Sequence, residues 1–137
     1  MQTKAQLVTT IAGEVETEGD TNGPALDGAL FNNPHGIAWH PNGKLYIADR
    51  WNHKIRVMDT NTGMVSTLAG TGDIGADDGP GESARFYEPW GIYVDIDENV
   101  YVADTKNYLI RKIDPSGVVS TIAGSGSFGV QDGPSFT

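Results

Sequence analysis

Short runs of apolar and β-branched residues alternate with groups of turn residues along the whole chain. Two such groups are Pro41-Asn42-Gly43 and Asp114-Pro115-Ser116-Gly117. This pattern predicts many short β-strands, because Val, Ile and Tyr favour extended backbone while Gly, Pro, Asn and Asp favour turns. No segment keeps an apolar 3.6-residue period over two turns, so no long helix is predicted.

The runs recur as a repeated unit. The motif Val-[Ser/Thr]-Thr-[Ile/Leu]-Ala-Gly begins at Val8, Val65 and Val119. Between its copies, Phe-x-x-Pro-x-Gly-Ile begins at Phe31 and again at Phe86. A third motif, Tyr-[Ile/Val]-Ala-Asp-x-x-Asn-x-x-Ile-Arg, follows in each unit. Because the blocks keep the same order and nearly the same spacing, the chain is predicted to consist of internal repeats.

Each repeat is predicted to contain four short antiparallel strands joined by tight turns. A long connection, residues 14–35 or 71–90, leads into each repeat. This arrangement predicts an all-β fold, a β-propeller with four-stranded antiparallel blades and two blades per chain. The predicted strands are a lone Leu7–Ala12, then Gly36–His40, Lys44–Ala48, Lys54–Asp59 and Met64–Ala69 in the first repeat, and Gly91–Asp95, Asn99–Ala103, Leu109–Asp114 and Val118–Ala123 in the second.

The prediction divides the chain into four parts. Residues 14–70 and 71–124 are the two blades, each with its long loop. Residues 1–13 hold the lone outer strand, which is expected to complete a neighbouring blade, and residues 125–137 hold part of a further loop. Because that loop stops before another Phe-x-x-Pro motif, a piece of a longer or engineered array is the alternative interpretation.

The motifs resemble those of NHL repeats. The resemblance rests on the three motifs given above together with Asp-Gly-Pro in the second long loop, and it covers nearly the whole chain. It implies a β-propeller, commonly with six blades. It leaves the function open, because NHL propellers include protein-binding and RNA-binding scaffolds as well as a few lyases.

Two blades alone expose two broad apolar faces, since each propeller blade packs against both of its neighbours. Exposed apolar patches mark association surfaces. Three copies would supply six blades, and cyclic symmetry is usual for homo-oligomers. The chain itself is therefore the first expected partner, in a homotrimeric six-bladed ring. Leu7–Ala12 of one copy and Val118–Ala123 of another would then compete for one outer position.

Charge narrows the range of other partners. The chain carries 18 Asp and Glu against 9 Lys and Arg, a formal net charge of −9. This charge argues against nucleic acid and anionic membranes, which both attract clustered basic residues. The absence of cysteine excludes disulfides, thiolate metal sites and a cysteine nucleophile. No signal peptide and no transmembrane segment is predicted.

Large amphipathic side chains are expected at one end of the blades. Strand direction places the long loops and the turns between second and third strands on the same face. Binding residues concentrate on such loops when a rigid scaffold holds them. The candidate site, for a protein, peptide or glycan ligand, uses side chains that combine contact area with a polar group. They are His35, Trp51, His53, Trp90 and Tyr108.

Several polar residues recur at fixed blade positions and are assigned structural roles. The aspartate and asparagine after the second strand are expected to cap a tight turn by bonding their own backbone. The arginine of the third strand is expected to form an exposed ion pair, worth ~0–1 kcal/mol, either with the aspartate that follows the second strand or with the one that ends the third, Asp59 or Asp114. These residues are Asp49, Asn52 and Arg56 in the first repeat and Asp104, Asn107 and Arg111 in the second.

Catalysis has little support in the sequence. The chain lacks the G-x-S-x-G, H-E-x-x-H and P-loop patterns. The sequence Asp95-x-Asp97-x-Asn99 lacks the glycine and glutamate of a calcium loop, and no metal or cofactor is predicted. The leading hypothesis is a non-enzymatic, self-assembling scaffold or binding module. The alternatives are a sub-array without its own function and a metal-dependent lyase or lactonase with its site in the central channel.

Overall fold

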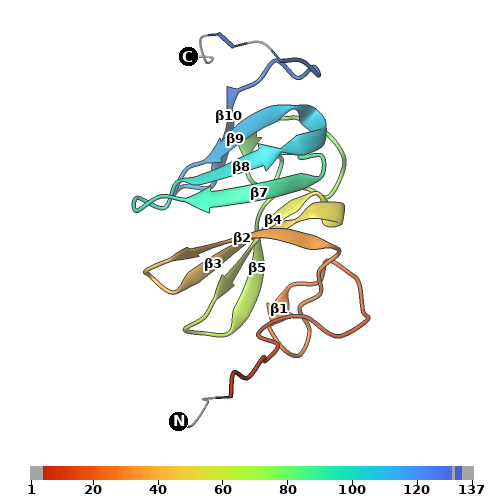
Figure 1. Cartoon of the computed structure of the whole chain (residues 1–137), viewed down its shortest axis with the longest axis vertical. Helices are drawn as coiled ribbons and strands as arrows, with labels where there is room; N and C mark the ends of the chain where they lie inside the picture. Colours follow the sequence, from red (N-terminus) through yellow and green to blue (C-terminus); the bar gives the residue numbers. More distant parts are fainter. Residues whose placement is uncertain (1–4, 131, 134–137) are drawn as a thin grey trace.

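The computed structural model describes residues 5–130, 132 and 133. They form two antiparallel five-stranded sheets, one stacked above the other (Figure 1). Blade 1 has the strand order β1-β5-β4-β3-β2, and blade 2 repeats it as β6-β10-β9-β8-β7. The bounds are β1 Gly23–Pro24, β2 Pro34–His40, β3 Lys44–Asp49, β4 Lys54–Asp59, β5 Met64–Ala69, β6 Gly79–Pro80, β7 Pro89–Val94, β8 Val100–Asp104, β9 Leu109–Ile113 and β10 Val118–Ala123.

The longer strands form where the sequence predicts them, with ends that shift by two residues or fewer. Two features differ from the prediction. Leu7–Ala12 forms no strand within the described residues and is largely exposed. The two-residue strands β1 and β6 are absent from the prediction. Gly23 pairs with Val65, and Gly79 pairs with Val119, so each long loop covers the outer edge of its own blade.

The two ends of the chain are described in part. Residues 1–4 of the expected segment 1–13, and residues 131 and 134–137 of the expected partial loop 125–137, lie outside the described residues. Residues 124–130 are exposed and form no strand. None of the helices in the described part is long and apolar enough to cross a membrane.

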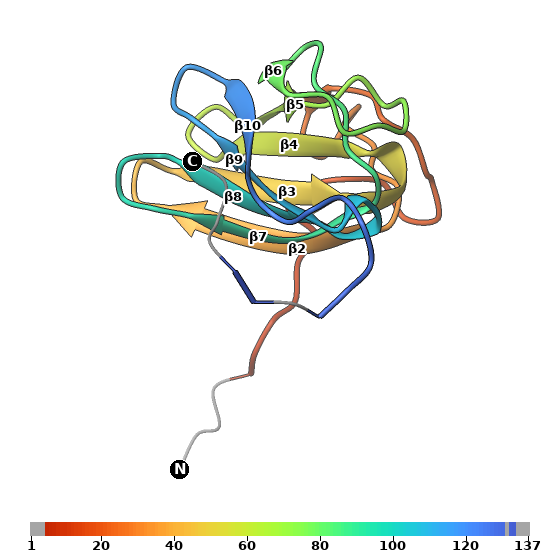
Figure 2. The same ribbon diagram turned by 90° about the horizontal axis from the view of Figure 1, so that it is seen from above.

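The main core lies between the two blades. Figure 2 shows β7 and β8 lying over β2 and β3. The sheets approach closely where they meet: a Cβ on Gly36 would lie 2.4 Å from the carbonyl oxygen of Trp90, so the position requires glycine. Buried apolar side chains from both sheets fill the interface. They include Tyr46, Ile55, Phe86, Val102 and Ile113.

A polar contact at the turn between β7 and β8 also joins the blades. Glu98 in this turn accepts hydrogen bonds from Asn42 Nδ2 (2.6 Å), Lys44 Nζ (2.8 Å) and Tyr46 Oη (3.1 Å) of blade 1. The bond from Lys44 is the main cause that holds the pKa of Glu98 below its ordinary value. Burial and the contact with Glu98 raise the pKa of Tyr46 to about 12. Tyr46 therefore keeps its proton and remains a donor at neutral pH.

A buried arginine in each blade ties the long loop to the sheet. Arg111 of β9 donates to Asp104 Oδ2 (2.8 Å). It also donates to two loop carbonyl oxygens, those of Arg85 (3.0 Å) and Asp77 (2.8 Å). Arg56 makes the matching bonds in blade 1. The expectation of exposed ion pairs is therefore wrong, because the loop folds over both partners and leaves their side chains 0% exposed.

The aspartate beside each arginine also acts differently from the expectation. Asp49 Oδ1 accepts the backbone N–H of Asn32 (2.8 Å), 17 residues away, and Oδ2 accepts Asn52 Nδ2 (2.8 Å). The same Asn52 amide donates to the carbonyl oxygen of Gly19 (2.6 Å), 33 residues away. The counterparts in blade 2 repeat this arrangement. These side chains join the turn to the long loop instead of capping the turn locally.

One position of this network differs between the blades. Asp78 of blade 2 accepts Arg111 Nε (3.2 Å) and Nη2 (2.7 Å), and it also accepts the backbone N–H of Thr121 (2.9 Å). Asn22 takes this place in blade 1 and accepts Arg56 Nη2 (2.7 Å), while Arg56 Nε has no hydrogen-bond partner among the described residues. Burial by itself would raise the pKa of Asp78, but the bonds from Thr121 and Arg111 outweigh it and hold that pKa below its ordinary value.

We expect Asn22→Asp to stabilise the chain and Asp78→Asn to destabilise it, each by about 1 kcal/mol at pH 7. This magnitude is reduced from that of a buried charged hydrogen bond because the side chain at this position is partly exposed. Urea unfolding measures both changes.

The Asp78→Asn effect also has a defined pH dependence. Because folding lowers the pKa of Asp78, its contribution is present above the ordinary value of 3.8 and is lost as the pH falls below it. A difference between wild type and Asp78→Asn that stays the same from pH 7 to pH 2 would contradict this assignment.

Candidate functional site

The turns that carry two of the predicted site residues are single-turn 3-10 helices. Helix η1, Arg50–Asn52, ends at His53, and helix η2, Thr105–Asn107, ends at Tyr108. His53 and Tyr108 have φ angles of 55° and 56°, in the left-handed region, and the chain reverses there into the next strand. Both turns bond to long loops, so loops and turns share one end of the blades, as the strand directions predict. We call this the loop end.

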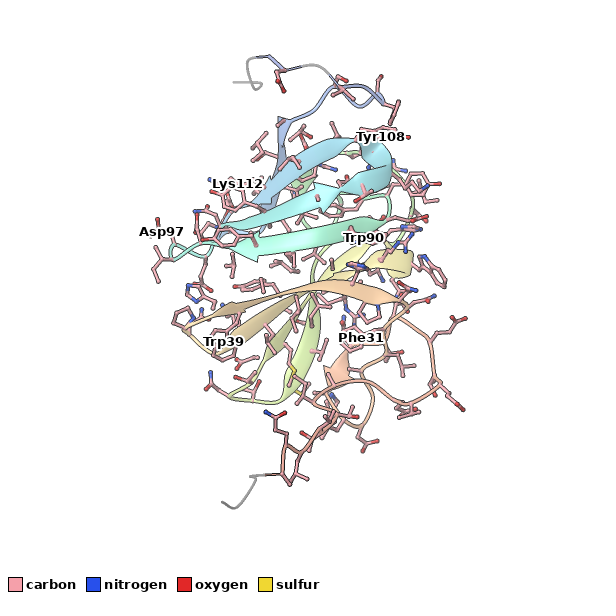
Figure 3. The ribbon with its side chains drawn as sticks, viewed as in Figure 1. Phe31, Trp39, Trp90, Asp97, Tyr108 and Lys112 are labelled. Atoms are coloured by element: carbon pink, nitrogen blue, oxygen red, sulfur yellow. The ribbon has the colours of Figure 1, made fainter. Side chains whose placement is uncertain are left out.

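An exposed aromatic cluster lies at the loop end, where the two blades meet. The ring centroids of His35 and Trp90 are 3.8 Å apart. The Arg50 guanidinium lies 4.5 Å from the centre of the Trp90 ring and 5.9 Å from that of Trp51. Trp51 and Trp90 remain 50% and 40% exposed. Figure 3 shows Trp90 at this end of the molecule. The aromatic cluster, as used below, is His35, Arg50, Trp51 and Trp90.

Glu88 fixes the position of Arg50 in the cluster. Its Oε2 accepts Arg50 Nη2 (2.6 Å) and Nε (3.1 Å). The hydrogen bond from Arg50 is the main cause that holds the pKa of Glu88 below its ordinary value, so the Glu88 carboxylate is ionised at neutral pH. The guanidinium is therefore held against Trp90 before any ligand binds.

His53 lies beside the cluster and joins the two blades. Its Nδ1 accepts the backbone N–H of Glu88 (3.1 Å), and its ring meets Tyr87 edge-on at 5.7 Å. Burial lowers the pKa of His53, although the charges of Glu88 and Asp104 act in the opposite direction. The neutral ring is the form that accepts this hydrogen bond. His53 is thus placed to hold the blade contact instead of facing a ligand.

Tyr108 lies one blade away from the cluster. Its half-exposed ring meets Phe128 of the tail, with 6.0 Å between centroids. Of the predicted site residues, the structure brings His35, Trp51 and Trp90 together in the cluster. His53 lies in the contact between the blades, and Tyr108 lies apart from the others.

Arg50 and Glu88 complete the cluster but are absent from the sequence prediction. Both positions change between the repeats, since Thr105 corresponds to Arg50 and Asn33 corresponds to Glu88. A search for residues that recur in both repeats therefore passes over them. Opposite charges that occur in one repeat only are the signal that would identify such a pair.

The repeated part of the chain matches a known family. The model of the NHL repeat matches residues 31–58 and 86–113. The chain contains two NHL repeats. This NHL-repeat chain is 41% identical over 96 residues to the protein SUPPRESSOR OF QUENCHING 1, chloroplastic, of Arabidopsis thaliana. It is 43% identical over 103 residues to NHL repeat-containing protein 2 of Gallus gallus. Each match covers 70% of this chain but 9% and 14% of the relatives, respectively.

A solved structure also resembles the two NHL repeats. The auxiliary nutrient binding protein from Bacteroides ovatus shares 28% identity with this chain, with a TM-score of 0.60. The likeness covers 73% of this chain and 27% of that protein. The two five-stranded sheets are consistent with part of a β-propeller, and the chain spans a minor part of each relative.

The described residues of the two NHL repeats contain no group of three His, Cys, Asp or Glu side chains that is placed to hold a metal ion. The calcium-like sequence Asp95-x-Asp97-x-Asn99 is the turn between β7 and β8. Asp95 Oδ1 accepts the backbone N–H groups of Asp97 (3.0 Å) and Asn99 (2.8 Å). The acidic side chain that begins this sequence therefore stabilises the turn.

Two hollows flank the first NHL repeat. A groove of about 730 Å³ lies between loop residues 12–18 and Trp51. A second hollow of about 270 Å³ lies over the apolar side chains of Ile37, Leu45 and Met58. Trp51 lines the groove and His35 lines the second hollow, whereas Arg50 and Trp90 line neither, so the aromatic cluster extends beyond any one of these hollows.

We expect His53→Asn to flatten the pH dependence of stability between pH 7 and pH 5. Asparagine tolerates the left-handed conformation and offers an acceptor to the Glu88 N–H, but it does not titrate. Folded His53 binds a proton less readily than the unfolded residue, whose pKa is near 6.5, so its contribution is present above that pH and is lost below it. Urea unfolding at pH 7, 6 and 5 measures the difference, and parallel profiles for wild type and variant would contradict the prediction.

Proposed function

We propose that this chain is a non-enzymatic part of a β-propeller that binds a protein or peptide segment at the loop end through the aromatic cluster. The observation that carries the proposal is the exposed pair of Trp51 and Trp90, with the guanidinium of Arg50 against both rings. Trp, Tyr and Arg supply most of the binding energy at protein interfaces, and they do so from small central groups of this kind.

The geometry favours a macromolecular ligand over a small molecule. Small molecules bind in concave pockets of roughly 300–1,000 Å³, whereas the cluster is not enclosed by a single hollow: Trp51 and His35 line different hollows, and Trp90 lines neither. Glu88 already fixes Arg50, so the cluster loses less side-chain freedom when a ligand binds. The relative from Bacteroides ovatus is described as a binding protein, which supports binding over catalysis.

The source of the remaining blades does not change this proposal. More of the same polypeptide, or further copies of this chain in a ring of three, would leave Trp90 exposed at the loop end, whereas Trp51 also lines the groove against which a preceding blade would pack. In a ring of three the cluster would occur three times, and linked weak sites gain strength through effective concentration. The lyase or lactonase alternative has no cluster of metal ligands among the described residues to support it.

The test is selection of a ligand followed by removal of the cluster. A phage library of random peptides is selected on the purified protein, and labelled peptides from the selection are titrated by fluorescence anisotropy. We expect Trp51→Ala and Trp90→Ala each to weaken binding about tenfold or more, the effect of truncating a central interface aromatic. Ile96→Ala is the control, because Ile96 is an exposed apolar residue in the turn between β7 and β8, away from the loop end.

Two results would overturn the proposal. In one, the selected peptides bind both tryptophan variants as well as they bind wild type. In the other, no peptide binds while a glycan array shows binding that depends on Trp51, which would assign the cluster to sugars.

A further inference from the structure

We propose that Leu7–Ala12 is a strand donor that occupies the position of β10 in a second copy of this chain. We call Leu7–Ala12 the donor segment. It pairs with no strand in the described residues, and Leu7 and Val8 are 89% and 99% exposed. Its residues extend away from the body of the molecule below blade 1, at the opposite end from β10 (Figure 1). This inference concerns the blade edge and does not rest on the ligand proposed above.

The donor segment has the sequence that the β10 position requires. Residues 8–13 read Val-Thr-Thr-Ile-Ala-Gly, and residues 119–124 read Val-Ser-Thr-Ile-Ala-Gly. In β10, Val119 is buried opposite Ile113, and Thr121 donates its backbone N–H and its hydroxyl to Asp78 (2.9 and 3.1 Å). Val8 would take the place of Val119, and Thr10 would make the bonds of Thr121. The remaining difference, Thr9 for Ser120, falls at an exposed position.

The backbone after the donor segment already has the geometry of a blade-to-blade junction. Gly70, which follows β5, has φ of +104° and donates its N–H to the carbonyl oxygen of Gly81 (2.9 Å) in the next loop. Gly13 has φ of +89° and donates to the carbonyl oxygen of Ala25 (2.7 Å), the equivalent residue of the first loop. Gly13 is therefore arranged as the end of a fourth strand that belongs to a preceding blade.

The parts absent around Gly13 are those that a preceding blade supplies. A Cβ on Gly70 would lie 2.6 Å from the carbonyl oxygen of His53, and one on Gly124 would lie 2.3 Å from that of Tyr108. Both carbonyls belong to turns that end a 3-10 helix. A Cβ on Gly13 would meet Phe31 instead, and the 730 Å³ groove lies beside it. The groove is the place where the corresponding turn of a second copy, ending at Tyr108, would lie.

A second copy provides the acceptor because its blade faces continue the interface between blades 1 and 2. Blade 1 exposes Ile37 and Trp39, and their counterparts Ile92 and Val94 pack against blade 1 in the chain itself. Blade 2 exposes Tyr93, whose counterpart Ala38 packs against the main core. The exposed apolar face of blade 2 in one copy can therefore pack against the exposed apolar face of blade 1 in another copy.

The donor segment is needed at the boundary between two copies, because the polar contacts there are weaker than those between blades 1 and 2 of one chain. Glu98 and Lys44 join the blades internally, but the equivalent positions at the boundary between copies are Gly43 and Asn99. The Arg50–Glu88 pair is likewise replaced by uncharged residues at that boundary. Backbone hydrogen bonds of an added strand supply attachment that does not depend on these charges.

Disulfide trapping tests the proposal, because the chain has no cysteine of its own. Ser120 lies opposite Lys112 in the sheet, so Thr9 of the donor would lie opposite Lys112 of a second copy. We expect the variant Thr9→Cys with Lys112→Cys to give disulfide-linked dimers and trimers on oxidation. Ser120→Cys with Lys112→Cys is the matched control for the chain whose own β10 fills the edge: in dilute, monomeric protein it should close within one chain, since paired strand positions lie within disulfide reach.

A second control fixes the position of the cross-link. Thr9→Cys with Asp97→Cys should remain monomeric, because Asp97 lies in the turn between β7 and β8, and β9 separates these strands from β10 in the sheet. The proposal is overturned if the Thr9/Lys112 variant stays monomeric while the Ser120/Lys112 control closes, or if the Thr9/Asp97 variant forms multimers equally well.

Light scattering supplies a test without cysteines. We expect Val8→Asp to lower the native mass of the wild-type assembly toward the 14.6 kDa of one chain, because it would bury a charge opposite Ile113 of the acceptor. Val130→Asp is the control, since Val130 is equally apolar and exposed but lies outside the donor segment and lines none of the hollows. An unchanged mass for Val8→Asp, or an equal fall for Val130→Asp, would contradict the proposal.

Discussion

The buried arginine of each blade is the interaction on which the rest of the structure depends. Each long loop has little regular secondary structure of its own, so its position is set by bonds from the sheet to loop carbonyl oxygens. Burying an arginine and an aspartate removes both from water and costs several kcal/mol per ion unless hydrogen bonds replace the lost solvation. Arg111 meets that condition through bonds to Asp104, to the loop backbone and to Asp78. The same bonds set where the chain enters β7, which carries Trp90 into the aromatic cluster.

Both repeats contain the buried arginine and its aspartate, but other contacts use residues that differ between the repeats. Charged contacts across the blade boundary, those of Glu98 and of Arg50 with Glu88, use residues that occur in one repeat only. The interface between blades 1 and 2 therefore contains charged pairs, while the outward faces of the two blades are apolar and lack these pairs. This difference gives the two blades a fixed order. It also places the aromatic cluster at the single boundary that the chain itself completes.

The sequence predicts the strands well because a period of two and the turn residues between strands are local signals. It predicts the loop end for the same reason, since strand direction decides which connections share a face. Burial of Arg56 is not predictable in this way, because it depends on a loop that begins more than 30 residues earlier. The pairing of Arg50 with Glu88 joins residues 38 positions apart without any repeat to reveal it. The structural role of His53 follows from a left-handed backbone at a residue that carries no glycine or asparagine signal.

Near identity of the donor segment and β10 has an energetic consequence for assembly. When one strand replaces another of nearly the same sequence, the hydrogen bonds and buried side chains of the edge position change little. The balance is then decided by two other quantities, the apolar area covered when the open blade faces meet and the entropy lost when separate chains associate. Only the second depends on protein concentration. A strand exchange of this kind therefore makes the number of blades in the assembly a function of concentration, while the fold of each blade stays the same.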